Sequence, residues 1–121
     1  MPRPEVARRV KSYSAATGYT FQYAFEEVRR ARRGFSSGKE YVYRVSADRK
    51  TSFPVTIFVR QDAIRAWGKN AGRAMNGTEE YAVAKMRLFQ AFDEVEDFTS
   101  VRPDLVVDDS NLEELLGWLD L

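Results

Sequence analysis

The sequence contains no cysteine and no histidine among its 121 residues. Without cysteine the chain can form no disulfide and offers no thiolate, and without histidine it lacks the most common base near neutral pH. Zinc and other soft metals lose their preferred ligands for the same reason. The sequence therefore singles out no catalytic residue and no cofactor, and these absences favour a protein that is not an enzyme over one that is.

Long hydrophobic runs are also missing. No apolar segment approaches the roughly 20 residues that span a bilayer, and the first ten residues, MPRPEVARRV, lack the apolar centre of a secretory signal. We expect a cytoplasmic protein with no membrane partner. The composition, 44% hydrophobic and 31% charged, is that of an ordinary globular protein. Its length predicts one domain over residues 1–121.

Acidic residues are scarce in the first half of the chain. Residues 1–60 hold 13 Lys or Arg against 5 Asp or Glu, a net charge of +8, whereas residues 61–121 hold 6 against 13, a net charge of −7. The overall charge of +1 hides this division. The asymmetry indicates a nucleic-acid surface, internal pairing of the two halves, or association between copies.

Helical spacing predicts two helices in the basic half, over about residues 4–16 and 20–33. Pro4 suits a first helical turn, and Gly18 and Gly34 suit helix ends. In the second segment apolar residues recur at i, i+3, i+4 and i+7. These residues are Phe21, Ala24, Phe25 and Val28.

The period changes from 3.6 to 2 in EYVYRVSADRKTSFPVTIFVR, which predicts a β-hairpin over residues 40–60 with its turn around residues 47–51. A lone hairpin is only marginally stable in water, so we expect a third strand, for which SVRPDLVV is the remaining candidate.

Three further helices are predicted, over residues 62–75, over residues 79–95 and from Ser110 onward. Thr78 can cap the second of them. Ser110 and Glu113 match the S-x-x-E capping box at the start of the third. The predicted fold is a single α+β domain of order ααββααβα, with helices packed on one face of a small, mainly antiparallel sheet.

The segment FEEVRRARRGF carries four arginines in five positions. On a helix, Glu26 and Glu27 would pair with Arg29 and Arg30, and the helix dipole would favour cations near its end. The remaining basic residues could present several cations to phosphates if the first two segments pack side by side. The predicted nucleic-acid-binding residues are Arg8, Arg9, Lys11, Arg29, Arg32, Arg33 and Lys39.

The C-terminal segment LEELL has the L-x-x-L-L spacing of short helices that dock in apolar grooves. The same spacing occurs in helices that cover a protein's own core. If the helix is shared between copies, its apolar residues form an interface. The predicted interface residues are Leu112, Leu115, Leu116, Trp118 and Leu119.

Three functions follow from these patterns. The first hypothesis is a non-enzymatic interaction or regulatory module that self-associates or binds a protein partner, and the alternative is a nucleic-acid-binding protein that uses the basic half. A second alternative is an enzyme that depends on Mg²⁺ or Ca²⁺, with oxygen ligands from the acidic segment DEVED and the carboxylates that follow. Its candidate ligands are Asp93, Glu96, Asp97, Asp104, Asp108 and Asp109.

Overall fold

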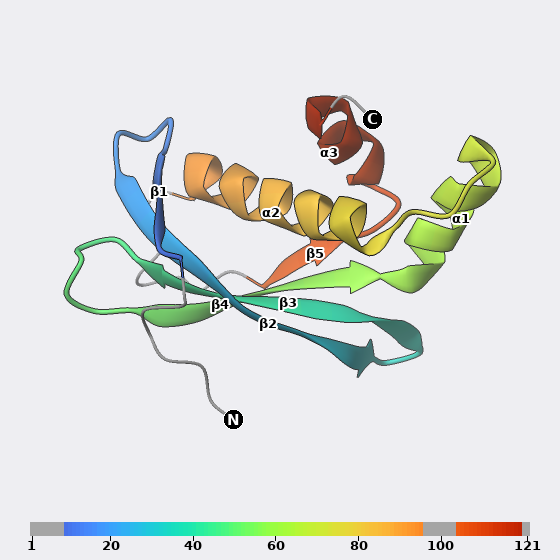
Figure 1. Ribbon diagram of the computed structural model, residues 1–121, viewed down its shortest axis with the longest axis horizontal. Helices are drawn as coiled ribbons and strands as arrows, with labels where there is room; N and C mark the ends of the chain where they lie inside the picture. Colours follow the sequence, from blue (N-terminus) through green and yellow to red (C-terminus); the bar gives the residue numbers. More distant parts are fainter. Residues whose placement is uncertain (1–8, 96–103, 120–121) are drawn as a thin grey trace.

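The computed structural model describes residues 9–95 and 104–119. Within them the chain forms five strands and three helices (Figure 1). In chain order the elements are β1 (Lys11–Ser14), β2 (Thr20–Arg33), β3 (Ser36–Ser46), β4 (Phe53–Arg60), α1 (Gln61–Ala71), α2 (Gly77–Glu94), β5 (Leu105–Val107) and α3 (Leu112–Leu119).

The five strands form one curled sheet in the order β1-β2-β3-β4-β5. The first four strands are antiparallel to their neighbours, and β5 runs parallel to β4. The sheet bends around α2, the long helix that lies along its concave side, and α3 packs on α2 (Figure 1). The helix α1 follows β4 directly and projects past the edge of this layer on the same side as the β2–β3 hairpin.

The predicted order ααββααβα is wrong. The segments predicted to be helices over residues 4–16 and 20–33 contain β1 and β2, so the element order is ββββααβα. The five-stranded sheet combines antiparallel and parallel pairs and forms the larger part of the fold. The part of the first predicted helix before residue 9 lies outside the described residues. The helices also do not simply cover one face of a small sheet, because the sheet curls around α2.

A β-bulge explains the error over residues 20–33. The pairing of β2 with β3 shifts between Phe25 and Glu27, so one extra residue is inserted there. Before the bulge, Phe21, Tyr23 and Phe25 point toward α2, where Phe21 stacks on Phe92 and Phe25 meets Tyr81 edge to face.

After the bulge the alternation restarts one residue later, and Val28 lies opposite Tyr41 on that same inner face. Positions 21, 25 and 28 therefore share one face of a strand at intervals that also fit one face of a helix. The helical period in this segment is a consequence of a bulged strand.

The hairpin predicted over residues 40–60 is confirmed as β3 and β4. The helices predicted from the second half are confirmed as α1, α2 and α3. Two predicted helix caps are wrong. The N-cap of α2 is Asn76 and not Thr78, and it forms a capping box with Glu79. The hydroxyl of Ser110 donates to Asp108 in the turn before α3 and so does not form the predicted capping box. The segment SVRPDLVV does contain a strand, β5, but it is the fifth strand and parallel to β4.

The core lies between the concave face of the sheet and the helices α2 and α3. Its largest fully buried side chains come from β2, β3 and β4 on one side and from the helices and β5 on the other. They are Tyr43, Phe21, Phe92, Ile57, Leu88, Leu115, Val45, Val59, Val83 and Val107. Phe58 is also buried, but it lies opposite Glu40 on the convex face of the sheet. Aromatic rings of α2, including Phe89 and Phe92, pack on aromatic rings of β1 and β2.

Because Gly38 in β3 has no side chain, the ring of Phe58 in β4 can lie close to the backbone of β3. A Cβ atom at residue 38 would clash with the carbonyl oxygen of Val59 and come within 2.7 Å of the Phe58 ring. We predict that Gly38→Ala lowers the free energy of unfolding by about 1–3 kcal/mol, because both the backbone of β4 and the ring have to move in a packed environment. Denaturant unfolding measures the loss.

Gly117→Ala is the matched control, since a Cβ atom there meets nothing within 4 Å. That change lies in α3 and is expected to be neutral or to stabilise the protein by up to about 1 kcal/mol. Equal stability of the Gly38→Ala and wild-type proteins would contradict the close contact with Phe58.

Candidate nucleic-acid interface

Strand geometry divides the four clustered arginines between two faces of the sheet. Arg29 lies opposite Glu40 on the convex face, and its Nε atom donates to Glu40 Oε1 at 2.8 Å. Arg33, on the same face, reaches the other oxygen of Glu40 at 3.2 Å. The hydrogen bond from Arg29, followed by the one from Arg33, holds the pKa of Glu40 below its ordinary value.

Arg33 has two further partners. Its Nη1 atom donates to Asp104 at 2.7 Å, and its guanidinium lies 4.6 Å from the centre of the Phe58 ring. Arg29 and Arg33 were both predicted to bind nucleic acid. The structure commits both side chains to contacts within the protein.

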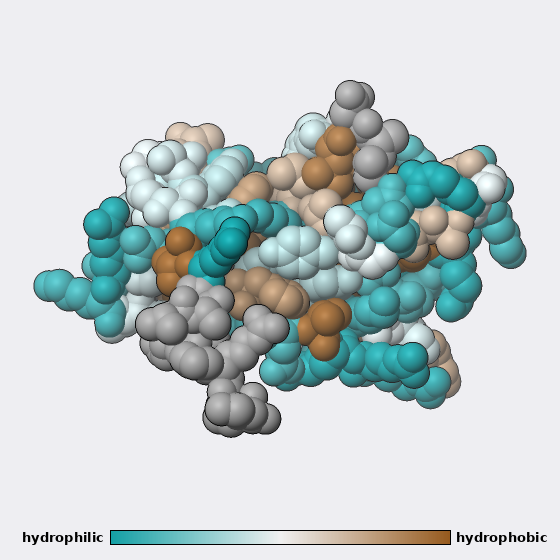
Figure 2. Space-filling model, in the orientation of Figure 1, coloured by the Kyte–Doolittle hydropathy of each residue, from teal (hydrophilic) through white to brown (hydrophobic). Residues whose placement is uncertain are grey.

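Arg30 and Arg32 lie on the opposite face, toward α1. Arg30 is paired with Lys39 of β3, and Arg32 with Ser37. Both line a hollow that also borders Gln61 and Arg65 of α1. Figure 1 shows the end of the hairpin and α1 projecting in the same direction, and Figure 2 shows a mainly hydrophilic surface over both.

Three adjoining hollows of about 720, 610 and 370 Å³ run between the hairpin, α1 and the start of α2. Lys39 lines all three of them. We call these three hollows together the basic groove. Its cationic lining residues are Arg30, Arg32, Lys39, Arg65, Lys69 and Arg73, with Arg29 at one margin.

Two cations of the basic groove are neutralised by neighbouring carboxylates. Lys39 pairs with Glu80 at 3.3 Å, and Arg73 binds Glu79 through two bonds of 2.7 and 2.6 Å. The other four, Arg30, Arg32, Arg65 and Lys69, form no ion pair with any residue in the described part of the chain. The groove therefore carries an excess of positive charge.

Glu80 forms part of the floor of the groove and is only 3% exposed. The Tyr41 hydroxyl donates to it at 2.7 Å, and the Gln61 side-chain amide donates at 3.4 Å. Burial, with this bond to the Glu80 carboxylate, raises the pKa of Tyr41. Together with the ion pair to Lys39, these contacts join the first turn of α2 to β3 and α1. They keep the two walls of the groove in place.

The start of α2 also faces the groove, because Gly77 lines two of its hollows. Asn76 and Glu79 close the helix start with a capping box. The bonds from Arg73 and then from the Asn76 amide lower the pKa of Glu79 to about 2. The carboxylates of Glu79 and Glu80 in this first turn offset the positive end of the helix dipole, so the excess positive charge of the groove comes from its side-chain cations.

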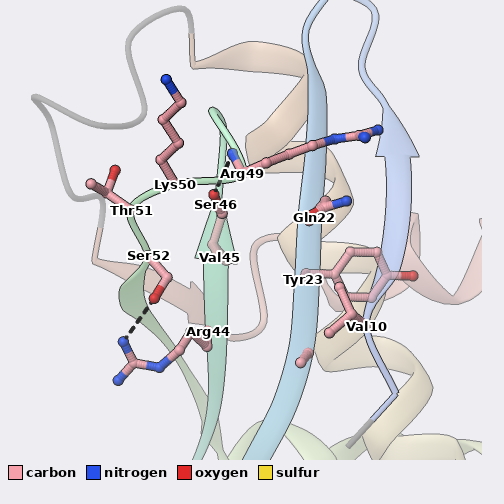
Figure 3. A pocket seen from close by; sticks show the side chains of 11 residues that line it. Val10, Gln22, Tyr23, Arg44, Val45, Ser46, Arg49, Lys50, Thr51 and Ser52 are labelled. Atoms are coloured by element: carbon pink, nitrogen blue, oxygen red, sulfur yellow. Dashed lines mark hydrogen bonds between the residues drawn. The ribbon is translucent and has the colours of Figure 1, made fainter.

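A second basic hollow of about 390 Å³ lies near the other end of the sheet, between β1, β2 and the β3–β4 turn (Figure 3). Arg44 on its wall is bound to Glu26 and Ser52, while Arg49 and Lys50 belong to the turn. This hollow offers fewer unpaired cations than the basic groove. It is the weaker candidate for an anion.

The structure separates the remaining predicted nucleic-acid residues from the groove. Arg8 lies outside the described residues, and Arg9 and Lys11 lie at β1. Lys11 is paired with Tyr23, ten residues before Arg33 along β2, which corresponds to roughly 30 Å. Of the predicted set, Arg32 and Lys39 line the main body of the groove, and Arg29 lies at its margin.

Three groove residues, Arg30, Arg65 and Lys69, are not among the residues predicted from the sequence. On a strand, Arg30 lies on the same face as Arg32, so a strand over residues 20–33 would have predicted it. Arg65 and Lys69 are four residues apart on α1, a spacing that places both on one helix face. Nothing local indicates that this face lies opposite the hairpin.

The candidate Mg²⁺ or Ca²⁺ ligands do not come together where they are described. Asp93 accepts hydrogen bonds from the Tyr13 hydroxyl at 2.8 Å and the Ala16 amide at 2.9 Å, and Asp104 binds Arg33. Asp108 shapes the turn before α3. Glu96 and Asp97 lie outside the described residues, within which no three carboxylates could share a metal ion.

The predicted interface residues divide between the core and the surface. Leu112, Leu115 and Leu116 are buried within the single chain. Trp118 is 54% exposed, and Leu119 packs at the edge of the core. An interface on α3 stays a prediction, and Trp118 is the residue most available to it.

Comparisons of the chain with protein-family models, with curated proteins and with solved structures give no match. Among the described residues, no helix is long and apolar enough to cross a membrane.

Proposed function

We propose that the protein binds nucleic acid through the basic groove. The observation that carries this proposal is the cluster of four cations, Arg30, Arg32, Arg65 and Lys69, which line adjoining hollows and form no ion pair among the described residues. Arg65 does have a carboxylate nearby, since the pKa of Asp62 is lowered first by its hydrogen bond from Arg60 and to a smaller extent by Arg65. A nucleic-acid backbone supplies regularly spaced phosphates, and several cations along one surface are the basis of its binding.

Internal pairing of the basic and acidic halves explains only part of the positive charge. Arg33 with Asp104 and Lys39 with Glu80 are contacts between the two halves. The four cations of the groove that form no ion pair are not neutralised by these contacts. Arg30 also lies directly opposite Lys39, and like charges in cross-strand positions destabilise a sheet. The groove thus places like charges together although their repulsion destabilises the sheet, and an anionic ligand would relieve this repulsion.

The side chains of the groove favour phosphate. Three of the four unpaired cations are arginines, whose planar guanidinium groups can donate two hydrogen bonds to one phosphate. Arg30 and Arg32 follow each other on one strand face, with a repeat of roughly 6.6 Å. An open groove with successive cations suits an extended polyanion better than a single small anion.

Self-association, the first hypothesis from the sequence, has less support. In the described residues β1 pairs with only Thr20 to Tyr23 of β2, so the rest of that strand edge could accept another strand. However, the bulge before Glu27 distorts this edge, and such a distortion discourages pairing between copies.

The proposal predicts salt-dependent binding of wild-type protein to a labelled oligonucleotide. With about four phosphate contacts, the logarithm of the binding constant should fall with the logarithm of salt concentration with a slope of about −3 for a single strand. Fluorescence anisotropy at several salt concentrations measures this slope. Absence of binding at micromolar protein and low salt would rule out the proposed function.

A further inference from the structure

We infer that the ligand of the basic groove is a single-stranded nucleic acid and that Phe35, at the tip of the β2–β3 hairpin, stacks on one of its bases. This inference rests on the proposed function and specifies its ligand.

Phe35 has no role in the fold that its position explains. It is fully exposed and belongs to the two-residue turn between Arg33 and Ser36. Gly34, the first turn residue, has a φ of 60°, which suits the hairpin turn that requires glycine at its first position. The second turn position needs no aromatic ring, and a small polar residue would close the hairpin equally well.

The position of Phe35 links it to the groove. The turn lies directly beyond Arg32 and Ser37, which line the outermost hollow. Phe35 itself lies outside the lining of this hollow, two residues along the chain from Ser37 and three from Arg32. An exposed aromatic ring therefore lies next to the cations at the outer end of the groove.

An exposed ring beside a row of cations matches the chemistry of an unpaired strand. Each nucleotide offers a phosphate to a cation and a base face to an aromatic ring, and stacking of this kind tolerates any base. In a duplex the base faces are already covered by neighbouring bases, so an exposed ring could stack only after the helix had been opened. The exposed ring of Phe35 therefore favours a single strand over a duplex.

The test compares Phe35→Ala with wild-type protein on oligothymidylate, oligouridylate and a duplex DNA of similar length. We expect Phe35→Ala to bind both single strands about tenfold more weakly. The slope of affinity against salt should stay the same, because no phosphate contact is removed. A strand containing 2-aminopurine should show quenching on binding wild-type protein and less quenching with Phe35→Ala.

Two variants control for other causes. Phe35→Trp keeps a stacking surface and should retain wild-type affinity. Trp118→Ala removes another exposed aromatic ring, on α3, and should leave binding unchanged. Melting temperatures of all variants should agree with that of wild type, because Phe35 makes no core contact.

The outcomes distinguish the inference from the function on which it rests. If wild-type protein binds neither single strands nor duplex, both are wrong. If it binds and Phe35→Ala binds single strands equally well, or if the duplex binds more tightly than the strands, nucleic-acid binding stands and the inference is overturned. Preference for oligouridylate over oligothymidylate, or the reverse, would identify RNA or DNA as the source of the strand and support the inference.

Discussion

Replacing Arg30, Arg32 and Arg65 together by glutamate is expected to abolish nucleic-acid binding at physiological salt. The change removes three unpaired cations from the basic groove and adds repulsion toward phosphate. Loss of three contacts should reduce the salt slope for a single strand by about 2 and lower the affinity at low salt on the order of 100-fold or more. Anisotropy titrations over a range of salt concentrations measure both quantities.

The matched control replaces Arg9, Lys11 and Lys50 by glutamate. These exposed residues lie away from the groove, and the substitutions change the net charge by the same amount. Binding by this variant should remain within a few-fold of wild type. An equal loss in both variants would mean that overall charge, and not the groove, attracts the ligand. The control also tests Arg9 and Lys11, which the sequence pattern placed in the binding set.

The groove variant is expected to stay folded. Arg30 lies opposite Lys39, so glutamate at residue 30 replaces a like-charge pair by an opposite-charge pair. Arg32 and Arg65 are exposed and have no ion-pair partner among the described residues. A melting temperature within a few degrees of wild type would show that the loss of binding is local.

Replacing Leu115 by aspartate is expected to unfold the protein. Leu115 is 0% exposed and lies where α3 packs on α2. Removal of a buried leucine side chain alone costs about 2–5 kcal/mol, and an unpaired carboxylate in its place adds a further penalty. The sum approaches the whole stability of a typical domain, about 5–15 kcal/mol. Circular dichroism and thermal melting measure the effect.

Two further variants and one further measurement complete this experiment. Leu115→Met conserves volume and should lose less than about 1.5 kcal/mol, while Trp118→Asp, on the exposed side of α3, should have little effect on the fold. Sedimentation separates the core from an interface. A folded Leu115→Asp monomer obtained from an oligomeric wild type would assign the helix to an interface between copies and would contradict its burial in a single chain.

Much of the second half of the chain is predictable because its signals are local. The apolar stripes of α1, α2 and α3 follow helical spacing, and glycines or polar caps separate these helices. The alternating residues of β3 and β4 likewise indicate a hairpin directly. In these segments the short-range pattern and the tertiary structure agree, so reasoning from the residues succeeds.

The segment of residues 20–33 is different, because its pattern fits two structures. The bulge near Glu26 gives a bulged strand the apolar intervals of a helix, and the charged residues of its second half fit either. The pairing with β3 and the stacking of Phe21 on Phe92 decide in favour of the strand. Phe92 is separated from Phe21 by most of the chain, so no local pattern contains this information.

The residues alone were sufficient to exclude thiol, imidazole and zinc chemistry, to reveal the opposed charges of the two halves, and to draw attention to FEEVRRARRGF. Which of its arginines could meet a ligand depended on tertiary contacts. Strand geometry turns Arg29 and Arg33 toward Glu40, and Arg30 and Arg32 toward α1, where Arg65 and Lys69 complete the groove. The physical reason is that the charge of a side chain is determined by its residue type alone. The position of that charge on a binding surface is determined by the pairing of strands and the packing of helices that are distant in sequence.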